Sequence, residues 1–308
     1  MTAVRSIAIL CLLGLGTLAT TPAGAAEAVA LILGERGGAY AEAAEAVRRE
    51  LGAAAEVTQR QADEIDGLAR MPLRAAVAIG TDACRALAQN NVSASLKLCL
   101  LLPKAAYDRI AEGARGRGKP PSVLLLDQPL ARQMALIRLA LPERRRIGVL
   151  LGPETVALGG ALAASADAQG LRVHVGRVEL PDDLAGALHK VLAEADVLLA
   201  VPDSVVYNSR TIQNVLRSTF MGRVPLVAFS PAYVRAGALL ALYSTPDQIG
   251  RQAGRALRAA LAGHELPPQQ HPQDFEVGVN PHVARSLGIE LDDGAMLAER
   301  LRRLESAR

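Results

Sequence analysis

The sequence predicts an α/β protein with two hydrophobic cores. From Ala28 onward, short apolar runs alternate with amphipathic stretches of helical period, a pattern typical of βαβ units whose parallel sheets are covered by helices. The chain has 308 residues, of which 50% are hydrophobic. Because single cores stop growing near about 250–300 residues, we expect two lobes rather than one.

The predicted strands are short apolar runs, and residues 197–202 are continuously apolar, as in a strand that is buried on both faces. The runs occupy residues 28–33, 75–80, 96–102, 122–126, 146–151, 171–178, 196–201 and 225–229. Amphipathic stretches such as 39–51 and 155–169 are the predicted helices between them. This alternation predicts right-handed crossover connections and parallel sheets.

Residues 1–25 are predicted to be a secretory signal peptide. The segment has one positive charge at Arg5, an apolar run over 7–18, and small residues at Ala23 and Ala25. An apolar run of about 12 residues is too short to span a bilayer, which needs roughly 20. We therefore expect export to the periplasm with cleavage after Ala25.

The exported chain would keep two cysteines, Cys84 and Cys99. In an oxidising compartment such a pair can form a disulfide, although two ordinary buried thiols explain the residues equally well. There is no Cys-x-x-Cys pattern. A thiol redox enzyme or a zinc ribbon therefore has no support in the sequence.

Charge and motifs do not favour nucleic-acid binding or catalysis. The formal charge is +3, or +2 without Arg5, which is too slight to indicate a nucleic-acid partner. The glycine-rich segment 34–40 matches neither the dinucleotide fingerprint nor the P-loop, and Ser230 lacks the Gly-x-Ser-x-Gly turn of hydrolases. The histidines have no metal-ligand spacing. We expect a protein that is not an enzyme and uses no cofactor or metal.

Polar residues follow several predicted strands, at the point where each strand ends. Ligands of open parallel sheets bind outside the carboxyl ends of the strands, and these ends carry Tyr40, Thr81, Asp203, Ser204 and Ser230. Polar residues at these positions can also be ordinary helix N-caps that need no ligand. The case for a site depends on several such loops converging.

From about Asp127 to its end, the chain resembles the substrate-binding proteins of ABC transporters, specifically the tryptophan- and tyrosine-type binders. The segments that carry the resemblance are "DQPLARQMALIRLALPERRRIGVLLGP", "DVLLAVPDS", "VPLVAFSPAYVRAGALLALYSTPDQIGRQAGRAL" and "DFEVGVNPHVARSLGIEL". Their order and spacing fit the family, whereas the first hundred residues match it less well. The early loop 34–40 and the strand 96–102 depart from the commoner pattern.

The resemblance implies a type I periplasmic-binding fold, with two doubly wound parallel-sheet lobes joined by a hinge. By that likeness the first lobe comprises residues 26–126 and 244–265. The second lobe comprises residues 127–243 and 266–308. The connections between the lobes would lie near 126–127, near 243–244 and within the Pro-rich segment 266–272.

The implied function is capture of a small polar or amino-acid-like ligand between the lobes, for delivery by a monomeric periplasmic protein to an ABC membrane permease. Asp203 would bind a ligand ammonium, and Thr81 with the backbone N–H groups after Gly80 would bind a carboxylate. The predicted ligand-binding residues are Tyr40, Thr81, Asp127, Asp203, Ser204, Ser230 and Tyr243.

An alternative function uses the same fold for sensing. In that case the liganded protein would present itself to a membrane kinase or an outer-membrane receptor, without an ABC permease. The poorer match of the first lobe to the family keeps this alternative open, because partner contacts lie on exposed lobe faces.

Overall fold

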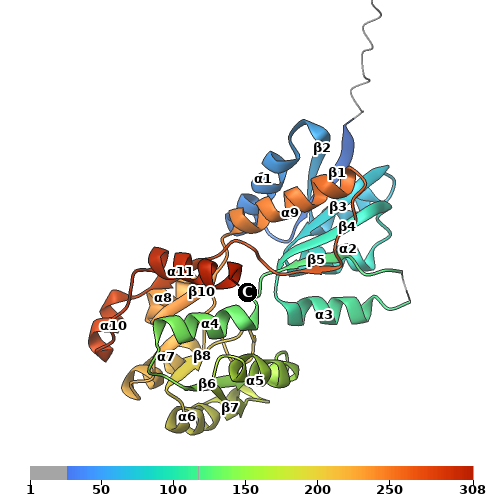
Figure 1. Cartoon of the computed structure of the whole chain (residues 1–308). Coiled ribbons are helices and arrows are strands. Elements are labelled where there is room, and N and C mark those ends of the chain that lie inside the picture. The colour runs from blue at the N-terminus through green and yellow to red at the C-terminus, as the bar shows by residue number, and fades with distance from the viewer. Residues whose placement is uncertain (1–25, 117, 308) are drawn as a thin grey trace, which may run out of the picture.

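The computed structural model describes residues 26–116 and 118–307, which form two α/β lobes (Figure 1). In this part of the chain each lobe contains a six-stranded sheet with helices on both faces. The predicted fold class is confirmed. The predicted signal peptide, residues 1–25, lies outside the described residues.

The first lobe has the strand order β11-β5-β4-β3-β1-β2, with every pair parallel. Its edge strand β2 was not predicted, because the sequence AEVTQRQ is mostly polar and only partly buried. The elements of this lobe are β1 (Glu27–Leu33), α1 (Gly38–Leu51), β2 (Ala55–Gln61), β3 (Leu73–Ile79), α2 (Thr81–Gln89), β4 (Ala94–Leu102), α3 (Lys104–Gly113), β5 (Ser122–Leu125), α9 (Pro246–Leu261) and β11 (Gln269–Gln270).

Helix α9 returns to the first lobe from late in the chain and packs along α1 (Figure 1). Two glycines allow the close approach. A Cβ atom on Gly250 would lie 2.4 Å from the Ala43 carbonyl oxygen, and one on Gly254 would lie 2.5 Å from the Cβ of Glu50. Larger residues at either glycine would push α9 away from α1, because real Cβ atoms do not approach so closely.

The second lobe has the strand order β12-β10-β9-β8-β6-β7. Strand β12 is antiparallel to β10, and the other described pairs are parallel. Its elements are α4 (Leu130–Ala140), β6 (Arg146–Leu151), α5 (Gly159–Asp167), β7 (Arg172–Arg177), α6 (Leu184–Glu194), β8 (Val197–Leu199), α7 (Ile212–Met221), β9 (Leu226–Ala228), α8 (Pro231–Ala236), β10 (Leu240–Tyr243), β12 (Glu276–Val279), α10 (Pro281–Leu287) and α11 (Gly294–Ser306). Short 3-10 helices occupy Gly52–Ala54, Ala62–Leu68, Val156–Leu158 and Pro181–Asp183.

The two lobes share one doubly wound topology. In each sheet the first strand lies between the second and the third, so the strand order reverses between β1 and β3 and between β6 and β8. Ligands of such sheets bind outside the carboxyl ends of the strands at this reversal. The topology therefore directs attention to the loops that follow β1, β3, β6 and β8.

The described chain passes between the two sheets at residues 126–129, 244–245 and 271–275. The predicted boundary placed everything from residue 266 in the second lobe. The structure differs there, because Leu266 packs in the core of the first lobe and β11 pairs with β5 of the first sheet. The chain thus enters the second lobe only after β11.

Buried polar side chains connect these three crossings. The Gln128 amide donates to Ser244 Oγ over 2.8 Å, and Ser244 Oγ donates to the Asp274 carbonyl over 2.5 Å. The Arg132 guanidinium donates to Gln128 Oε1 and to the Pro272 carbonyl, each at 2.8 Å. Gln128, Arg132 and Ser244 are at most 8% exposed. The hinge is therefore a hydrogen-bonded unit rather than three independent linkers.

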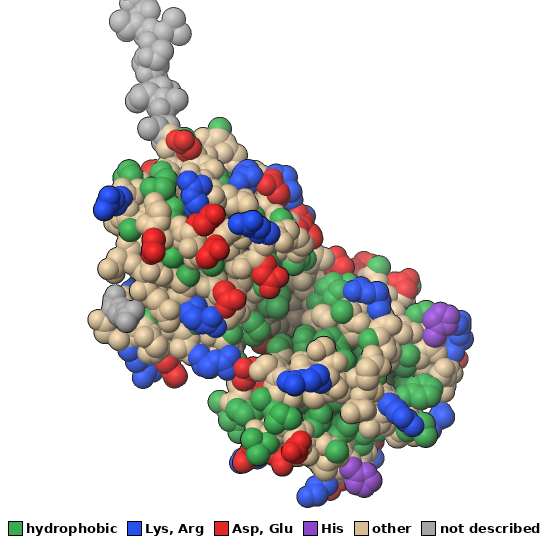
Figure 2. Space-filling view, turned by 180° about the vertical axis from the view of Figure 1, so that it is seen from behind, with side chains coloured by type: hydrophobic (Ala, Val, Ile, Leu, Met, Phe, Trp, Pro, Cys, Tyr) green, Lys and Arg blue, Asp and Glu red, His purple; other side chains and the backbone are tan. Residues whose placement is uncertain are grey.

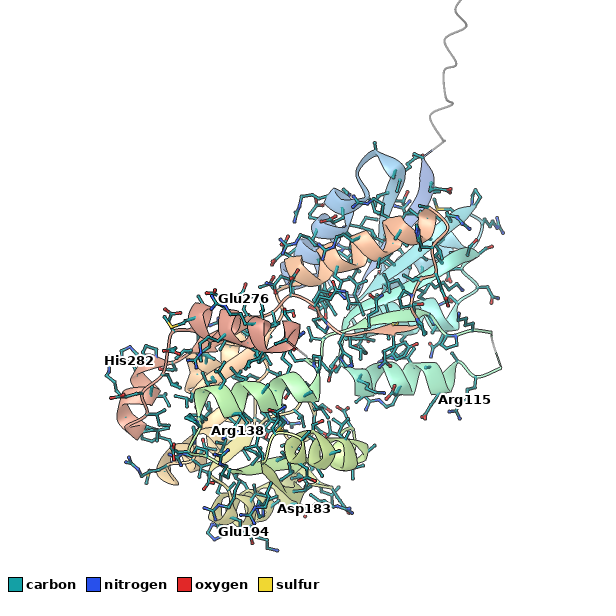
Figure 3. All side chains as sticks on the ribbon, viewed as in Figure 1. Arg115, Arg138, Asp183, Glu194, Glu276 and His282 are labelled. Atoms are coloured by element: carbon teal, nitrogen blue, oxygen red, sulfur yellow. A yellow bond between two sulfur atoms is a disulfide. The ribbon has the colours of Figure 1, made fainter. Side chains whose placement is uncertain are left out.

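The surface is hollowed between the lobes, and apolar side chains gather around the hollow (Figure 2). Charged side chains lie on the outside of both lobes, as Arg115 on the first lobe and Asp183 and Glu194 on the second illustrate (Figure 3). Among the helices that the structure describes, none is long and apolar enough to cross a membrane.

Cys84 on α2 and Cys99 on β4 form a disulfide in the structure. Both residues are fully buried between α2 and the sheet. The bridge ties a helix to the strand that follows it, across a sequence separation of 15 residues.

Replacing both Cys84 and Cys99 with alanine should lower the free energy of unfolding by about 3 kcal/mol, because a bridge across a loop of this length restricts the unfolded chain. Denaturant unfolding of the chain beginning at Ala26 measures the loss. Thiol labelling of the same unfolded, unreduced chain should find no reactive thiol. Two labelled thiols per molecule would contradict the bridge.

Candidate functional site

Two predicted site residues lie at the starts of the helices that follow β1 and β3, Tyr40 in α1 and Thr81 in α2. Gly80 has φ +97°, and a Cβ atom there would lie 2.6 Å from a ring carbon of Tyr40. Glycine is needed at this position for both reasons. The Tyr40 ring therefore packs against the residue that directly precedes Thr81, the first residue of α2. Burial, together with the nearby carboxylates of Glu35 and Asp82, raises the pKa of the Tyr40 hydroxyl, which therefore stays protonated at neutral pH.

Asp203, which the sequence predicts to bind a ligand ammonium, lies beneath the surface of the second lobe. It is 3% exposed. One carboxylate oxygen accepts from Thr155 Oγ1 at 2.8 Å, and the other accepts from the Val205 and Val206 N–H groups at 3.0 and 3.4 Å. A Cβ atom on Gly152 would lie 2.3 Å from the carboxylate. These contacts make Asp203 the support of the loops after β6 and β8, and they leave no oxygen directed at a ligand.

Ser204 is exposed and takes part in a contact between the lobes. Its backbone N–H and hydroxyl donate to Glu154 at 3.1 and 2.9 Å. Arg109, on α3 of the first lobe, donates to the same carboxylate at 2.8 Å. Burial raises the pKa of Glu154, but the hydrogen bonds from Ser204 and Arg109 outweigh burial and hold that pKa below its usual range. Ser204 thus positions a carboxylate that links the lobes.

Ser230 and Tyr243 occupy the ends of β9 and β10. Ser230 precedes α8, and its hydroxyl has no hydrogen-bond partner within the described chain. The Tyr243 hydroxyl donates to Glu276 at 3.1 Å, across the pair formed by β10 and β12. Ser230 therefore keeps a free donor, whereas Tyr243 is engaged within its own lobe.

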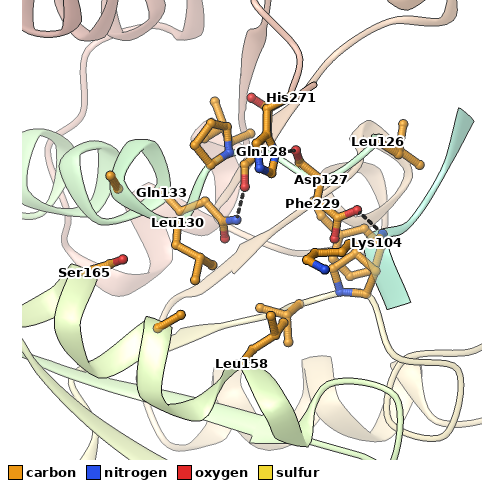
Figure 4. A pocket seen from close by; sticks show the side chains of 16 residues that line it. Lys104, Leu126, Asp127, Gln128, Leu130, Gln133, Leu158, Ser165, Phe229 and His271 are labelled. Atoms are coloured by element: carbon orange, nitrogen blue, oxygen red, sulfur yellow. Dashed lines mark hydrogen bonds between the residues drawn. The ribbon is translucent and has the colours of Figure 1, made fainter. Parts of the chain in front are cut away.

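A cavity of about 380 Å³ opens between the lobes beside the hinge (Figure 4). Of the seven predicted binding residues, Asp127 alone lines it. Its walls come from α3, the first crossing, α4, α5, the ends of β8, β9 and β10, and the third crossing. They comprise Lys104, Leu126, Asp127, Gln128, Pro129, Leu130, Ala131, Gln133, Leu158, Ala161, Ser165, Val201, Pro202, Phe229, Leu242 and His271.

Asp127 lies where the first crossing leaves β5, at the end of the cavity near α3 (Figure 4). Its carboxylate accepts from the Lys104 backbone N–H at 2.7 Å, at the start of α3, and its carbonyl contacts His271 Nδ1 at 3.0 Å. Burial raises the pKa of the Asp127 carboxyl, and the Lys104 N–H bond, His271 and the Lys104 charge oppose that shift only in part. A carboxylate held at a cost in desolvation is typical of ligand-binding sites.

Phe229 is the main cavity residue that the sequence reasoning missed. It follows β9 directly and precedes Ser230, so the rule of strand ends could have found it. Its ring packs 4.8 Å from Tyr233 and 6.2 Å from Tyr207, measured between centroids. The Tyr207 hydroxyl is buried and has no hydrogen-bond partner in the described structure, and burial raises its pKa strongly. Tyr207 and Tyr233 therefore pack against the Phe229 ring and restrict its position.

Other cavity residues carry no recognisable signal in the sequence. Gln133 and Ser165 are single polar positions on helices α4 and α5, and Leu158 and Ala161 read as ordinary helical residues. These four residues come together at the cavity because α4 packs beside α5 in the second lobe. No group of three or more possible metal ligands occurs among the described residues.

A comparison of the sequence with models of protein families finds one matching family. The sequence profile of the family described as "ABC transporter substrate binding protein" matches residues 126–300, which is more than half of the chain. The chain belongs to this family. The match covers the second lobe, the hinge and most of the cavity walls. A comparison of the sequence with curated proteins gives no match.

Solved structures share the fold of this substrate-binding protein at low sequence identity. An open, ligand-free substrate-binding protein with adhesive properties from Clostridium difficile has a TM-score of 0.66 and 16% identity, over 86% of this chain and 96% of that one. An ABC domain from Streptococcus pneumonia in complex with L-Trp has a TM-score of 0.59 and 16% identity over the same shares. A conserved domain protein from Vibrio cholerae has a TM-score of 0.57 and 22% identity, over 88% and 97%. The predicted type I periplasmic-binding fold is confirmed.

Replacing Asp203 with alanine should destabilise the second lobe by about 2–4 kcal/mol, because the Thr155 hydroxyl and two backbone N–H groups lose their buried acceptor. Asp203→Asn should cost about 1 kcal/mol, since the amide oxygen still accepts from the backbone. Denaturant unfolding measures both values. A stability equal to that of the unsubstituted chain for Asp203→Ala would return Asp203 to the list of ligand-binding residues.

Replacing Asp127 with asparagine should raise the melting temperature of the ligand-free protein at pH 7.5. Because the folded-state pKa of Asp127 is raised, its contribution to stability is fully present below the unfolded pKa and is lost as the pH rises through the folded pKa. Asparagine has no charge to bury and therefore avoids this loss of stability, and its amide oxygen can still accept from the Lys104 backbone N–H. The difference between variant and parent should therefore shrink on acidification toward pH 4. A variant less stable than the parent at pH 7.5 would show that the charged carboxylate stabilises the fold.

Proposed function

We propose that this protein is a periplasmic receptor that captures a small ligand in the cavity beside the hinge and delivers it to an ABC permease. The observation that carries the proposal is the position of the cavity, which is walled by both lobes and by two of the three crossings. A ligand there would contact both lobes and two of the crossings between them. Binding would thus shift the equilibrium between open and closed arrangements.

The ligand that fits best has a largely apolar body and few polar groups, as an amino-acid-like compound does. Leu130, Leu158, Val201, Phe229 and Leu242 contribute most of the wall on the side of the second lobe. A sugar presents hydroxyl groups over its whole surface, and burial without matched hydrogen bonds costs free energy for each one. The sparse polar groups of this cavity suit an aromatic or aliphatic ligand better.

The contact between Arg109 and Glu154 would favour the arrangement in which α3 approaches the second lobe. The two charged groups lie 2.8 Å apart, and Arg109 remains more than half exposed. Exposed ion pairs contribute about 0–1 kcal/mol, which is small enough for ligand binding and release to make and break the contact. The pair therefore suits a reversible closure.

Export and assembly follow from the same proposal. Residues 1–25 would direct secretion and be removed near Ala25. The mature chain would act as a monomer, because the two lobes of one chain already enclose the cavity.

A thermal-shift screen of amino acids and related metabolites against the chain beginning at Ala26 tests the proposal. A ligand of the folded state should raise the melting temperature, with a stabilisation of about 2.7 kcal/mol at one hundred times its dissociation constant. Ala161→Trp should abolish the shift, because Ala161 lines the cavity and the indole would fill it.

Ala163→Trp is the matched control. It lies on the same helix, is exposed and does not line the cavity. A ligand whose stabilisation survives Ala161→Trp would place the binding site elsewhere. A screen without any stabilising compound would count against the receptor function itself.

A further inference from the structure

The charges around the hinge cavity are unequal. Among the described residues that line it, Asp127 is the one carboxylate, no arginine is present, and Lys104 is the one ammonium. The Lys104 ammonium lies 2.6 Å from Asp108, on the next turn of α3. Asp127 itself forms no ion pair with any described side chain. The cavity therefore contains a carboxylate without a cation, whereas its cation already has a counter-ion.

The neighbouring polar groups also present acceptors to the cavity. His271 Nδ1 contacts the Asp127 carbonyl, which can only accept, so this nitrogen carries the proton, and in the corresponding tautomer Nε2 is the acceptor. The Gln133 amide donates to the Gln128 carbonyl at 2.9 Å, and its own carbonyl oxygen remains an acceptor (Figure 4). A ligand group that binds here must therefore bring donors.

Apart from Ser165 on α5, the remainder of the cavity is apolar, and it extends between α4 and α5. Leu130 on α4 faces Leu158 on the other side, and Phe229 forms part of the wall near the hinge (Figure 4). Ala161 on α5 also lines this part of the cavity. A ligand whose donor group lies at Asp127 would place its body against these side chains. Matching an apolar body to this wall removes apolar surface from water.

We propose that the cavity selects a primary amine with an apolar body, that Asp127 binds its ammonium group, and that a ligand carboxylate is not required. The proposal deepens the receptor function and depends on it. It also moves the recognition of the ammonium from Asp203, whose oxygens are occupied within the second lobe, to Asp127. The ligand class differs from that of a site built around a carboxylate, which would need an arginine or free backbone donors.

Matched pairs of compounds separate the amine from the acid. Titration calorimetry at pH 7.5 compares tryptamine with indole-3-propionate and phenethylamine with 3-phenylpropionate, which share a body and differ in the charged end. Each amine should bind at least tenfold more tightly than its acid partner. Equal affinity within the pairs, tighter binding of the acids, or the absence of binding by both amines would overturn the proposal.

Asp127→Asn should weaken amine binding at least thirtyfold while the protein stays folded, because the amide keeps the bond from the Lys104 N–H and loses only the charge. Glu112→Gln, an exposed carboxylate on the same helix α3 but outside the cavity, should leave amine binding unchanged. Circular dichroism at the titration temperature verifies that both variants are folded. Unchanged affinity in Asp127→Asn would overturn the assignment of Asp127.

Failure of this inference is distinguishable from failure of the receptor function. If acids or uncharged compounds bind and Ala161→Trp blocks them, the cavity is a ligand site and the amine class is wrong. If Ala161→Trp leaves every bound compound unaffected, the cavity is not the ligand site and both proposals fall together.

Discussion

The hydrogen bond from Gln128 to Ser244 is the contact on which the two-lobed arrangement depends, because it joins the first crossing to the second inside the protein. Arg132 extends it to the third crossing through the Pro272 carbonyl, and the Arg132 guanidinium lies 4.3 Å from the centre of the Phe275 ring. Buried polar groups are costly unless they are paired. The paired set therefore favours one relative placement of the three crossings and disfavours independent movement of the strands that they join.

In the proposed function, this hinge would also determine where the ligand binds. The cavity lies directly beside the paired groups, and Gln128 belongs to both: its side chain holds Ser244, and its carbonyl accepts from Gln133. The carboxylate of Asp127, one residue earlier, caps the start of α3 in the first lobe. Rotation of the lobes about the hinge would therefore change the cavity walls, while the hinge residues keep their own contacts. A ligand in this position would contact both lobes at once, so its binding would depend on how the lobes are placed relative to each other.

The fold was predictable because its signals are local and repeated. Continuous apolar runs mark strands buried on both faces, and β2 was missed because an edge strand needs no such run. The site was predictable only in part. Asp127 was named only through the resemblance to the substrate-binding proteins. The rule of strand ends selected Asp203 instead, whose carboxylate is already hydrogen-bonded to Thr155 and to the backbone that follows it. Side chains such as Gln133 reach the cavity through packing between helices, which leaves no periodic trace in the sequence.

The central claim is that the lobes close as rigid bodies about this hinge when a ligand occupies the cavity. Pulsed electron spin resonance between labels at Arg115 on the first lobe and Asp183 on the second, both exposed and on opposite sides of the cleft (Figure 3), measures the distance between the lobes directly. Adding a compound that stabilises the protein through the cavity should move the distance distribution to shorter values and narrow it. An unchanged distribution in the presence of saturating ligand would contradict the account.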